Sequence, residues 1–167
     1  MKKIGMILLS LVLLGLPTWG VTQSVPRQAY PAWQMVDVTS DRGTKLSVGV
    51  VEVIRGEEAW NRLKEDEENQ PPGKEMEYVV VKVKGVYRGG PPEFVNFRRA
   101  WAETPDGIML EKGVPPGGTP WWFYELKPEK PEMETEFVFL APKGVTPLYF
   151  RLGFGAFQTW EAWFLVP

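Results

Sequence analysis

The chain has 167 residues, of which 44% are hydrophobic and 24% charged, with eight Trp and a formal net charge of −2. This length fits one domain, the hydrophobic content excludes a wholly disordered chain, and the charge gives no indication of nucleic-acid binding. Because the sequence contains neither Cys nor His, disulfides, thiol or Ser–His nucleophiles and zinc sites of the usual ligand types are excluded.

The first residues have the pattern of a secretory signal peptide. Two Lys residues precede an apolar run, Ile4–Leu16, and a proline ends it. We assign residues 1–20 to this signal, and cleavage after Gly20 or after Ser24 fits the small residues found there. An uncleaved membrane anchor is the alternative, although a spanning helix needs about 20 apolar residues. We therefore expect a secreted, extracellular or cell-surface protein, with a retained anchor as its one route to a membrane.

The first part of the exported chain is predicted to be a tether. Residues 21–40 are interrupted by prolines and lack periodicity, except that Trp33–Val38 fits a first strand. The domain itself is expected over residues 41–167. Its first clear strand is predicted at Leu46–Arg55, because β-branched residues dominate there and suit a pleated surface.

One segment departs from the β pattern. Glu57–Glu68 contains no Gly, Pro or β-branched residue, and Ala59, Trp60 and Leu63 form one narrow apolar stripe. This pattern predicts a short surface helix. We expect Trp60 to be its structural anchor, buried against the sandwich, because an isolated helix of this length is marginal in water.

The remaining elements are predicted to be short strands. In Tyr78–Tyr87, Val79, Val81 and Val83 share one parity while Lys82 and Lys84 share the other, which indicates one packed face and one wet face. Similar alternation or aromatic enrichment predicts further strands at Phe94–Glu103, Ile108–Glu111, Trp121–Leu126, Glu136–Ala141, Leu148–Phe154 and Thr159–Val166. Eight or nine short strands separated by turns indicate an all-β fold, an antiparallel β-sandwich with one short surface helix.

Several segments follow one another in an order that resembles a known family. They are Gly56-Glu57-Glu58-Ala59-Trp60, Pro71-Pro72-Gly73, Glu77-Tyr78, Leu126-Lys127-Pro128 and Ala141-Pro142-Lys143. Over about Leu46–Phe154 the chain resembles the secreted immunoglobulin-like domains of bacteria, the telokin-like group that includes the mycobacterial immunoprotective extracellular protein. The resemblance implies an immunoglobulin-like sandwich and an extracellular location. It carries over no catalytic residues, and it is weaker where Tyr87-Arg88-Gly89-Gly90 replaces the Asn-x-Gly turn of the family.

The aromatic run at 121–124 is the candidate ligand platform. Trp121, Trp122 and Tyr124 offer ring faces on which a sugar or a partner could stack, although a core role for part of the run is the alternative. Two further clusters fit plain solvated surface better than a site. They are the acidic run Glu65–Asn69, which lacks calcium-loop spacing, and a basic group of Lys82, Lys84, Arg88, Arg98 and Arg99.

The function that these observations favour is a non-catalytic interaction module. We expect no enzyme activity, no catalytic residue, no cofactor and no metal site, because no spacing of the many carboxylates selects a pair for acid–base chemistry. The expected partner is an extracellular protein or a cell-wall glycan, and no nucleic acid. A carbohydrate-binding module that uses surface aromatics is the alternative.

Overall fold

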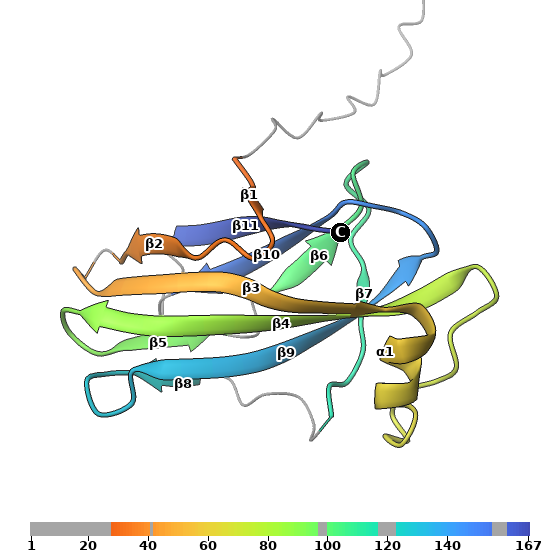
Figure 1. The fold of residues 1–167 in the computed structure, drawn as a ribbon, viewed down its shortest axis with the longest axis horizontal. Coiled ribbons are helices and arrows are strands. Elements are labelled where there is room, and N and C mark those ends of the chain that lie inside the picture. The colour runs from red at the N-terminus through yellow and green to blue at the C-terminus, as the bar shows by residue number, and fades with distance from the viewer. Residues whose placement is uncertain (1–27, 41, 97–99, 117–122, 155–159) are drawn as a thin grey trace, which may run out of the picture.

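Two β-sheets pack face to face, with one short helix at an end of the molecule (Figure 1). The computed structural model describes residues 28–40, 42–96, 100–116, 123–154 and 160–167. The elements are β1 (Tyr30–Pro31), β2 (Val36–Thr39), β3 (Lys45–Arg55), α1 (Gly56–Leu63), β4 (Met76–Gly89), β5 (Glu93–Asn96), β6 (Trp101–Glu103), β7 (Glu111–Lys112), β8 (Phe123–Leu126), β9 (Glu132–Pro142), β10 (Leu148–Phe154) and β11 (Trp160–Val166).

The strands form a five-stranded and a six-stranded sheet. The five-stranded sheet has the order β2-β3-β4-β9-β7, and the six-stranded sheet has the order β1-β11-β10-β5-β8, with β6 also paired to β10. All strand pairs are antiparallel except β1–β11, which is parallel. The predicted all-β class, an antiparallel sandwich with one short helix, is confirmed.

The main core lies between the sheets and follows the alternation in β4. Val79, Val81 and Val83 are at most 1% exposed and point inward, while Lys82 and Lys84 point to solvent. From the opposite sheet, the ring of Phe150 lies 5.4 Å from the ring of Phe137, 5.9 Å from Phe139 and 6.4 Å from Phe164, centroid to centroid. Burying such aromatic and branched side chains supplies the main driving force for folding.

A second, smaller core lies on the outer face of the five-stranded sheet, under α1. It consists of Ile54, Ala59, Leu63, Tyr78, Val80 and Val138. The helix is shorter than predicted, because after Leu63 the chain turns back through hydrogen bonds from Asp66 N–H to Leu63 O and from Asn69 N–H to Asp66 O. Within the described residues no helix is long and apolar enough to cross a membrane.

Some strand boundaries differ from the sequence expectation. The strand predicted at Trp33–Val38 is only β2, Val36–Thr39, and an additional short strand, β1, precedes it in the other sheet, so that the chain changes sheets between them. The strand expected at Phe94–Glu103 is described as β5 and β6, with residues 97–99 between them outside the description. The hairpin strand expected at Ile108–Glu111 is not a regular strand, although it returns along β6 through a bridge between Glu103 and Met109 and a hydrogen bond from Leu110 N–H to Ala102 O, and Glu111 begins β7. The predicted signal peptide lies outside the described residues.

Candidate interaction site

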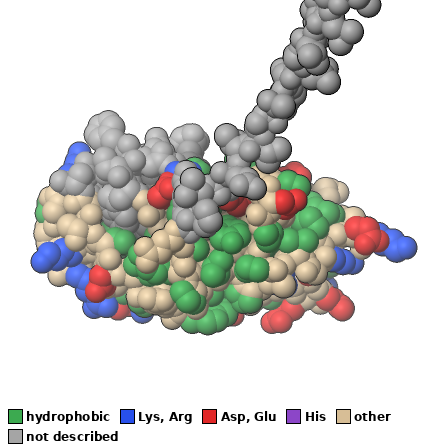
Figure 2. Space-filling view, turned by 90° about the horizontal axis from the view of Figure 1, so that it is seen from above, with side chains coloured by type: hydrophobic (Ala, Val, Ile, Leu, Met, Phe, Trp, Pro, Cys, Tyr) green, Lys and Arg blue, Asp and Glu red, His purple; other side chains and the backbone are tan. Residues whose placement is uncertain are grey.

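Five large hydrophobic side chains are exposed on the described surface, and they fall into two groups. Trp33, Met35 and Val51 lie on or beside β1, β2 and β3, whereas Ile108 and Met109 lie in the turn between β6 and β7; we call the five together the apolar edge. In Figure 1 the turn between β6 and β7 rises on the same side of the sandwich as β1. Figure 2, seen from above, shows hydrophobic side chains interspersed with polar ones on this face. An exposed apolar group of this kind marks an interaction surface more often than scattered single side chains do.

The backbone holds Trp33 outward at the point where the chain changes sheets. Ala32 N–H donates to the carbonyl of Leu165 at 3.0 Å, and Trp33 N–H donates to the carbonyl of Val50 at 2.9 Å. Trp33 has a φ of +74° and is 58% exposed. A bulky residue in this conformation costs on the order of 1–3 kcal/mol, so the turn is maintained by its two hydrogen bonds and not by local preference.

Gly49 allows this turn to lie directly on β3. A Cβ atom at position 49 would lie 2.7 Å from the carbonyl oxygen of Gln34 and 2.9 Å from the sulfur of Met35. Next to it, the register of β3 against β4 shifts between Val50 and Glu52, which leaves Val51 as an extra, exposed residue. The close approach and the bulge therefore place Met35 and Val51 beside Trp33.

A well-bonded turn presents the second apolar tip. Thr104 N–H donates to the carbonyl of Ile108 at 2.9 Å, and Ile108 N–H donates to the hydroxyl of Thr104 at 3.1 Å. The same hydroxyl donates to a carboxylate oxygen of Asp106 at 2.5 Å. These bonds fix the turn, at whose end Ile108 and Met109 are 60% and 68% exposed.

A charged hollow of about 450 Å³ lies over β4 and β9, away from the apolar edge. Its lining residues are Arg62, Lys82, Pro115, Pro116, Glu134, Thr135 and Glu136. The charges are paired inside it, because Arg62 contacts Glu136 and the Nζ atom of Lys82 lies 2.9 Å from a carboxylate oxygen of Glu134. This hydrogen bond raises the pKa of Lys82 and lowers the pKa of Glu134, so both stay charged at neutral pH.

Trp60 lies where the sequence analysis expects an anchor, but it is half-buried. Its indole stacks on the ring of Tyr78 with centroids 5.8 Å apart, and the fully buried side chains of the helix are Ala59 and Leu63. Beside it, the buried amide of Asn69 donates to the carbonyl of Val114 at 2.8 Å and accepts from Val114 N–H at 2.9 Å. The Asn69 side chain therefore joins the segment after α1 to the segment after β7.

A row of aromatic and charged side chains crosses the outer face of the six-stranded sheet. The guanidinium of Arg151 lies 3.6 Å from the ring centroid of Trp101 and 5.5 Å from that of Trp163. Arg151 also pairs with the carboxylate of Glu161, which accepts a hydrogen bond from the indole N–H of Trp163 at 3.0 Å. Trp101, Arg151 and Trp163 are in register on β6, β10 and β11, so their side chains form a continuous layer.

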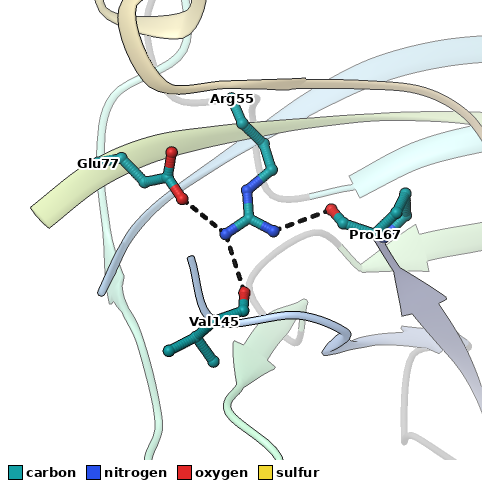
Figure 3. Close-up of polar contacts among 4 residues, drawn as sticks. All are labelled: Arg55, Glu77, Val145 and Pro167. Carbon is teal, nitrogen blue, oxygen red and sulfur yellow. Dashed lines mark hydrogen bonds and ion pairs between the residues drawn. The ribbon is translucent and has the colours of Figure 1, made fainter. Parts of the chain in front are cut away.

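Arg55 joins three separate parts of the chain at the end of β3 (Figure 3). One guanidinium nitrogen lies 2.7 Å from the carboxylate of Glu77 and donates to the carbonyl of Val145 at 2.9 Å. The other donates to the carbonyl of Pro167 at 3.0 Å. Every contact in this group is intramolecular, so the group ties the two sheets together at this end.

The candidate residues of the sequence analysis are only partly placed. Trp121 and Trp122 lie outside the described residues, and Tyr124 belongs to β8, at the edge of the six-stranded sheet. Of the basic group, Lys82 and Lys84 each pair with a Glu of β9, and Arg98 and Arg99 are not described.

The acidic run is not arranged as a calcium loop. Its Asp66 accepts a hydrogen bond from Glu68 N–H, and its Asn69 is turned inward to Val114. Among the described side chains no three acidic groups lie close enough together to hold a metal ion.

The apolar edge is not predicted from the sequence. The predicted strands Trp33–Val38 and Ile108–Glu111 include Trp33 and Ile108 as strand residues. The one available signal was the Thr104-Pro105-Asp106-Gly107 sequence, which predicts a turn and thereby an exposed position after it.

The comparisons with known proteins indicate a fold that other bacterial proteins share. No family model matches the chain, and no curated protein matches it. Among solved structures, the chain is similar to a Bacillus subtilis protein provisionally classed as a lipoprotein, with a TM-score of 0.54 and 12% identity over 78% of this chain and 38% of that chain. It thus spans well under half of that protein. An uncharacterised β-sandwich protein of Clostridium difficile has a TM-score of 0.43 and 11% identity, over 87% of this chain and 99% of that chain. At such identities the likeness concerns the fold alone.

Proposed function

We propose that the chain is a non-catalytic interaction module, secreted or held at the cell surface, and that it contacts its partner through the apolar edge. The observation that carries the proposal is the exposure of Trp33, Ile108 and Met109 on a well-packed sandwich. Two separate turns hold these side chains in solvent. Exposing large apolar side chains is unfavourable in a free protein, so a surface that gathers them is explained by a partner that covers them.

The location and the family are part of the same proposal. The apolar run at 4–16 supports export, and the fold is similar to that of a Bacillus subtilis protein provisionally classed as a lipoprotein. The ordered segments around Trp60 and Tyr78 support a relation to the telokin-like secreted domains of bacteria. We assign no catalytic role to any residue.

Photo-crosslinking on intact cells of the source organism tests the proposal. A photoreactive p-benzoylphenylalanine replaces Met109 in one variant and Glu129 in a second. Glu129 is the matched control, because it is also exposed and lies in the turn between β8 and β9, away from the apolar edge. We expect a discrete adduct, with protein or lipid, from position 109 and none from position 129. Equal labelling at both positions, or none at either, would reject the apolar edge as an interaction surface.

A carbohydrate-binding module is the second candidate, and the aromatic row on the six-stranded sheet favours it. Trp101, which is partly exposed, and Trp163, which is 8% exposed beside Arg151, lie on the outer face of the sheet whose edge strand, β8, carries Tyr124. Sugars stack on such rings in many binding modules. Titration of the purified protein with cell-wall polysaccharides, followed by Trp fluorescence, tests this. A shift that disappears in Trp101→Ala would support sugar binding on this row, and one that disappears in Trp121→Ala and Trp122→Ala would support binding on the run at 121–124. An unchanged spectrum would exclude sugar binding.

A further inference from the structure

We infer that β9 binds an extended protein segment along its outer edge at Glu134–Glu136, and that this segment carries basic side chains at alternate positions. The segment joins the five-stranded sheet as a further strand and lies in the charged hollow. The site is separate from the apolar edge, so the inference goes beyond the proposed function and is tested independently of it.

Within the described residues, β9 is paired along only part of this outer edge. β4 pairs with the whole of β9 on one side, whereas β7 pairs on the other side with Phe139 and Leu140. Gly113 N–H then donates to the carbonyl of Val138 at 2.9 Å. Two prolines follow at 115 and 116, and they have no N–H with which to continue the ladder. In Figure 1 the chain after β7 accordingly runs away from β9.

The backbone groups of Glu134 and Glu136 point toward this edge. The hydrogen bond from Gly113 shows that the carbonyl of Val138 points away from β4, and the register of β9 against β4 runs without a shift. Along a regular antiparallel strand, alternate residues direct their N–H and C=O groups to opposite sides. Glu134 and Glu136 have the same parity as Val138 and therefore direct theirs away from β4 as well. Such an edge is a template on which an extended segment can add as a strand.

The charged hollow provides the room for this strand. Its volume is about 450 Å³, and Glu134, Thr135 and Glu136 all line it, as do Pro115 and Pro116. Successive side chains point to opposite faces of a strand, so a hollow lined by three successive residues lies at the edge of β9 and not over one face. The space between β9 and the two prolines is therefore where an added strand would lie.

The alternation of charge across the outer face of the sheet predicts the sign of the added side chains. Glu52 of β3, Lys82 of β4 and Glu136 of β9 are neighbours in register. A positive side chain on the next strand continues this order, because opposite charges on neighbouring strands attract. Glu134, although it pairs with Lys82, keeps 47% of its side chain exposed, so its carboxylate can contact a second cation.

The same charges argue against a second copy of the chain on this edge. Pairing of β9 with the β9 of another copy, outward residue against outward residue, would place Glu134 and Glu136 opposite other carboxylates. Like charges directly opposite each other destabilise a strand pair. The occupant that fits the edge is therefore a basic segment of another protein.

Fluorescence anisotropy of a labelled peptide, Lys-Val-Lys-Val-Lys, titrated with the full chain tests the inference. A residue opposite Glu134 or Glu136 exchanges both backbone hydrogen bonds with it and carries its side chain on the same face. The Lys residues of the peptide therefore donate to β9, and the Val residues point their N–H groups to solvent. One peptide is methylated on the backbone nitrogens of its Lys residues, and the matched control on those of its Val residues. A further peptide, Lys-Lys-Lys-Val-Val, has the same charge without the alternation.

Two variants of the protein complete the test. Glu134→Gln removes one carboxylate of the site, and Glu125→Gln, which removes the carboxylate of β8 that pairs with Lys127, is the control. We expect the alternating peptide to bind, and methylation at Lys to weaken it about tenfold or more, while methylation at Val changes its affinity less than about twofold. We expect Glu134→Gln to weaken binding about twofold to fivefold, and Glu125→Gln to leave it unchanged.

Equal affinities of the two methylated peptides would overturn the inference, because an added strand donates hydrogen bonds from one of its sides only. Equal binding of the peptide without alternation would identify a general attraction between charges, and binding of none of the peptides would show that the edge takes no strand. Both results overturn the inference. A dimer of the protein alone that the alternating peptide dissociates would identify a second copy as the occupant and would overturn it too.

Discussion

The indole of Trp60 stacks on the ring of Tyr78, with the centroids 5.8 Å apart and the ring planes 13° apart. Trp60 comes from α1 and Tyr78 from β4, so this contact connects the helix to the five-stranded sheet. Around it lie the buried side chains of Ala59 and Leu63. The helix is therefore held by a small outer core in which Trp60 covers the rim.

Replacing Trp60 should destabilise the fold by less than the loss of a wholly buried Trp. Emptying a buried aromatic site costs roughly 3–5 kcal/mol, and Trp60 is only half-buried. We expect Trp60→Ala to lower the free energy of unfolding by about 2–3 kcal/mol, and Trp60→Phe, which keeps a stacked ring, by about half of that. Urea melts measure both, and an unchanged midpoint for Trp60→Ala would contradict the anchoring role.

Tyr78 should make the fold sensitive to alkaline pH. Its hydroxyl donates to the carbonyl of Gln70 at 2.9 Å, and burial raises the pKa of Tyr78 above its ordinary value of 10.0. Above pH 10 the unfolded chain loses this proton while the folded chain keeps it, so the free energy of unfolding falls as pH rises. At pH 7, Tyr78→Phe should lower the free energy of unfolding by about 1 kcal/mol through the lost hydrogen bond. Above pH 10, the free energy of unfolding of this variant should fall less steeply than that of the original protein. Parallel declines in the two proteins would refute this.

Replacing Asn69 should destabilise the fold more than replacing its neighbour Gln70. Its amide satisfies both the N–H and the carbonyl of Val114, and it is 6% exposed. In Asn69→Ala the N–H and the carbonyl of Val114 lose their hydrogen-bond partner while they remain largely buried. Each unsatisfied group costs about 1–3 kcal/mol. We expect a loss of about 2–3 kcal/mol in urea melts. The exposed neighbour Gln70 is the control, and Gln70→Ala should stay within about 0.5 kcal/mol of the original protein.

The sequence predicts the buried face of a strand well when the alternation of its side chains matches the way the strand packs. The alternation of Val and Lys in β4 indicated which face is buried, because a half-buried strand is a local pattern that needs no knowledge of its partners. The helix was predicted too long, to Glu68. Its end depends on Asn69, whose amide contacts Val114, 45 residues away in sequence. Such a tertiary contact produces no periodic pattern in the sequence.

The apolar edge could not be found from the sequence for a similar reason. Trp33 reads as a core or strand residue, and its outward position follows from two hydrogen bonds to Leu165 and Val50. Those acceptors belong to different sheets, so the conformation of Trp33 is decided only when the sandwich closes. The strand predicted at Ile108 failed because a well-bonded turn centred on Thr104 overrides its β-propensity.

Gly49 should tolerate no side chain, although a strand normally favours one. A Cβ atom would lie 2.7 Å from the carbonyl oxygen of Gln34, a backbone atom that cannot move without breaking the turn. We expect Gly49→Ala to cost about 1–3 kcal/mol, as overpacking does. Gly73→Ala is the matched control, since its nearest contact is 3.8 Å away, and it should be neutral or slightly stabilising. Equal thermal midpoints for the two variants would show that the backbone at Gln34 can move away from β3 at little cost.

The strain at Trp33 predicts an inverted preference between Ala and Gly. At an exposed strand position in regular register, such as Glu134 of β9, Ala is expected to be more stable than Gly by roughly 0.5–1 kcal/mol. At position 33 the φ of +74° disfavours every residue with a Cβ, so Trp33→Gly should be more stable than Trp33→Ala by about 1 kcal/mol. Urea melts of the four variants measure the two differences, and the comparison within each position cancels the loss of the original side chain. If Ala were the more stable residue at both positions, the backbone of Trp33 would not be strained, and the outward position of its indole would need no support from the hydrogen bonds to Leu165 and Val50.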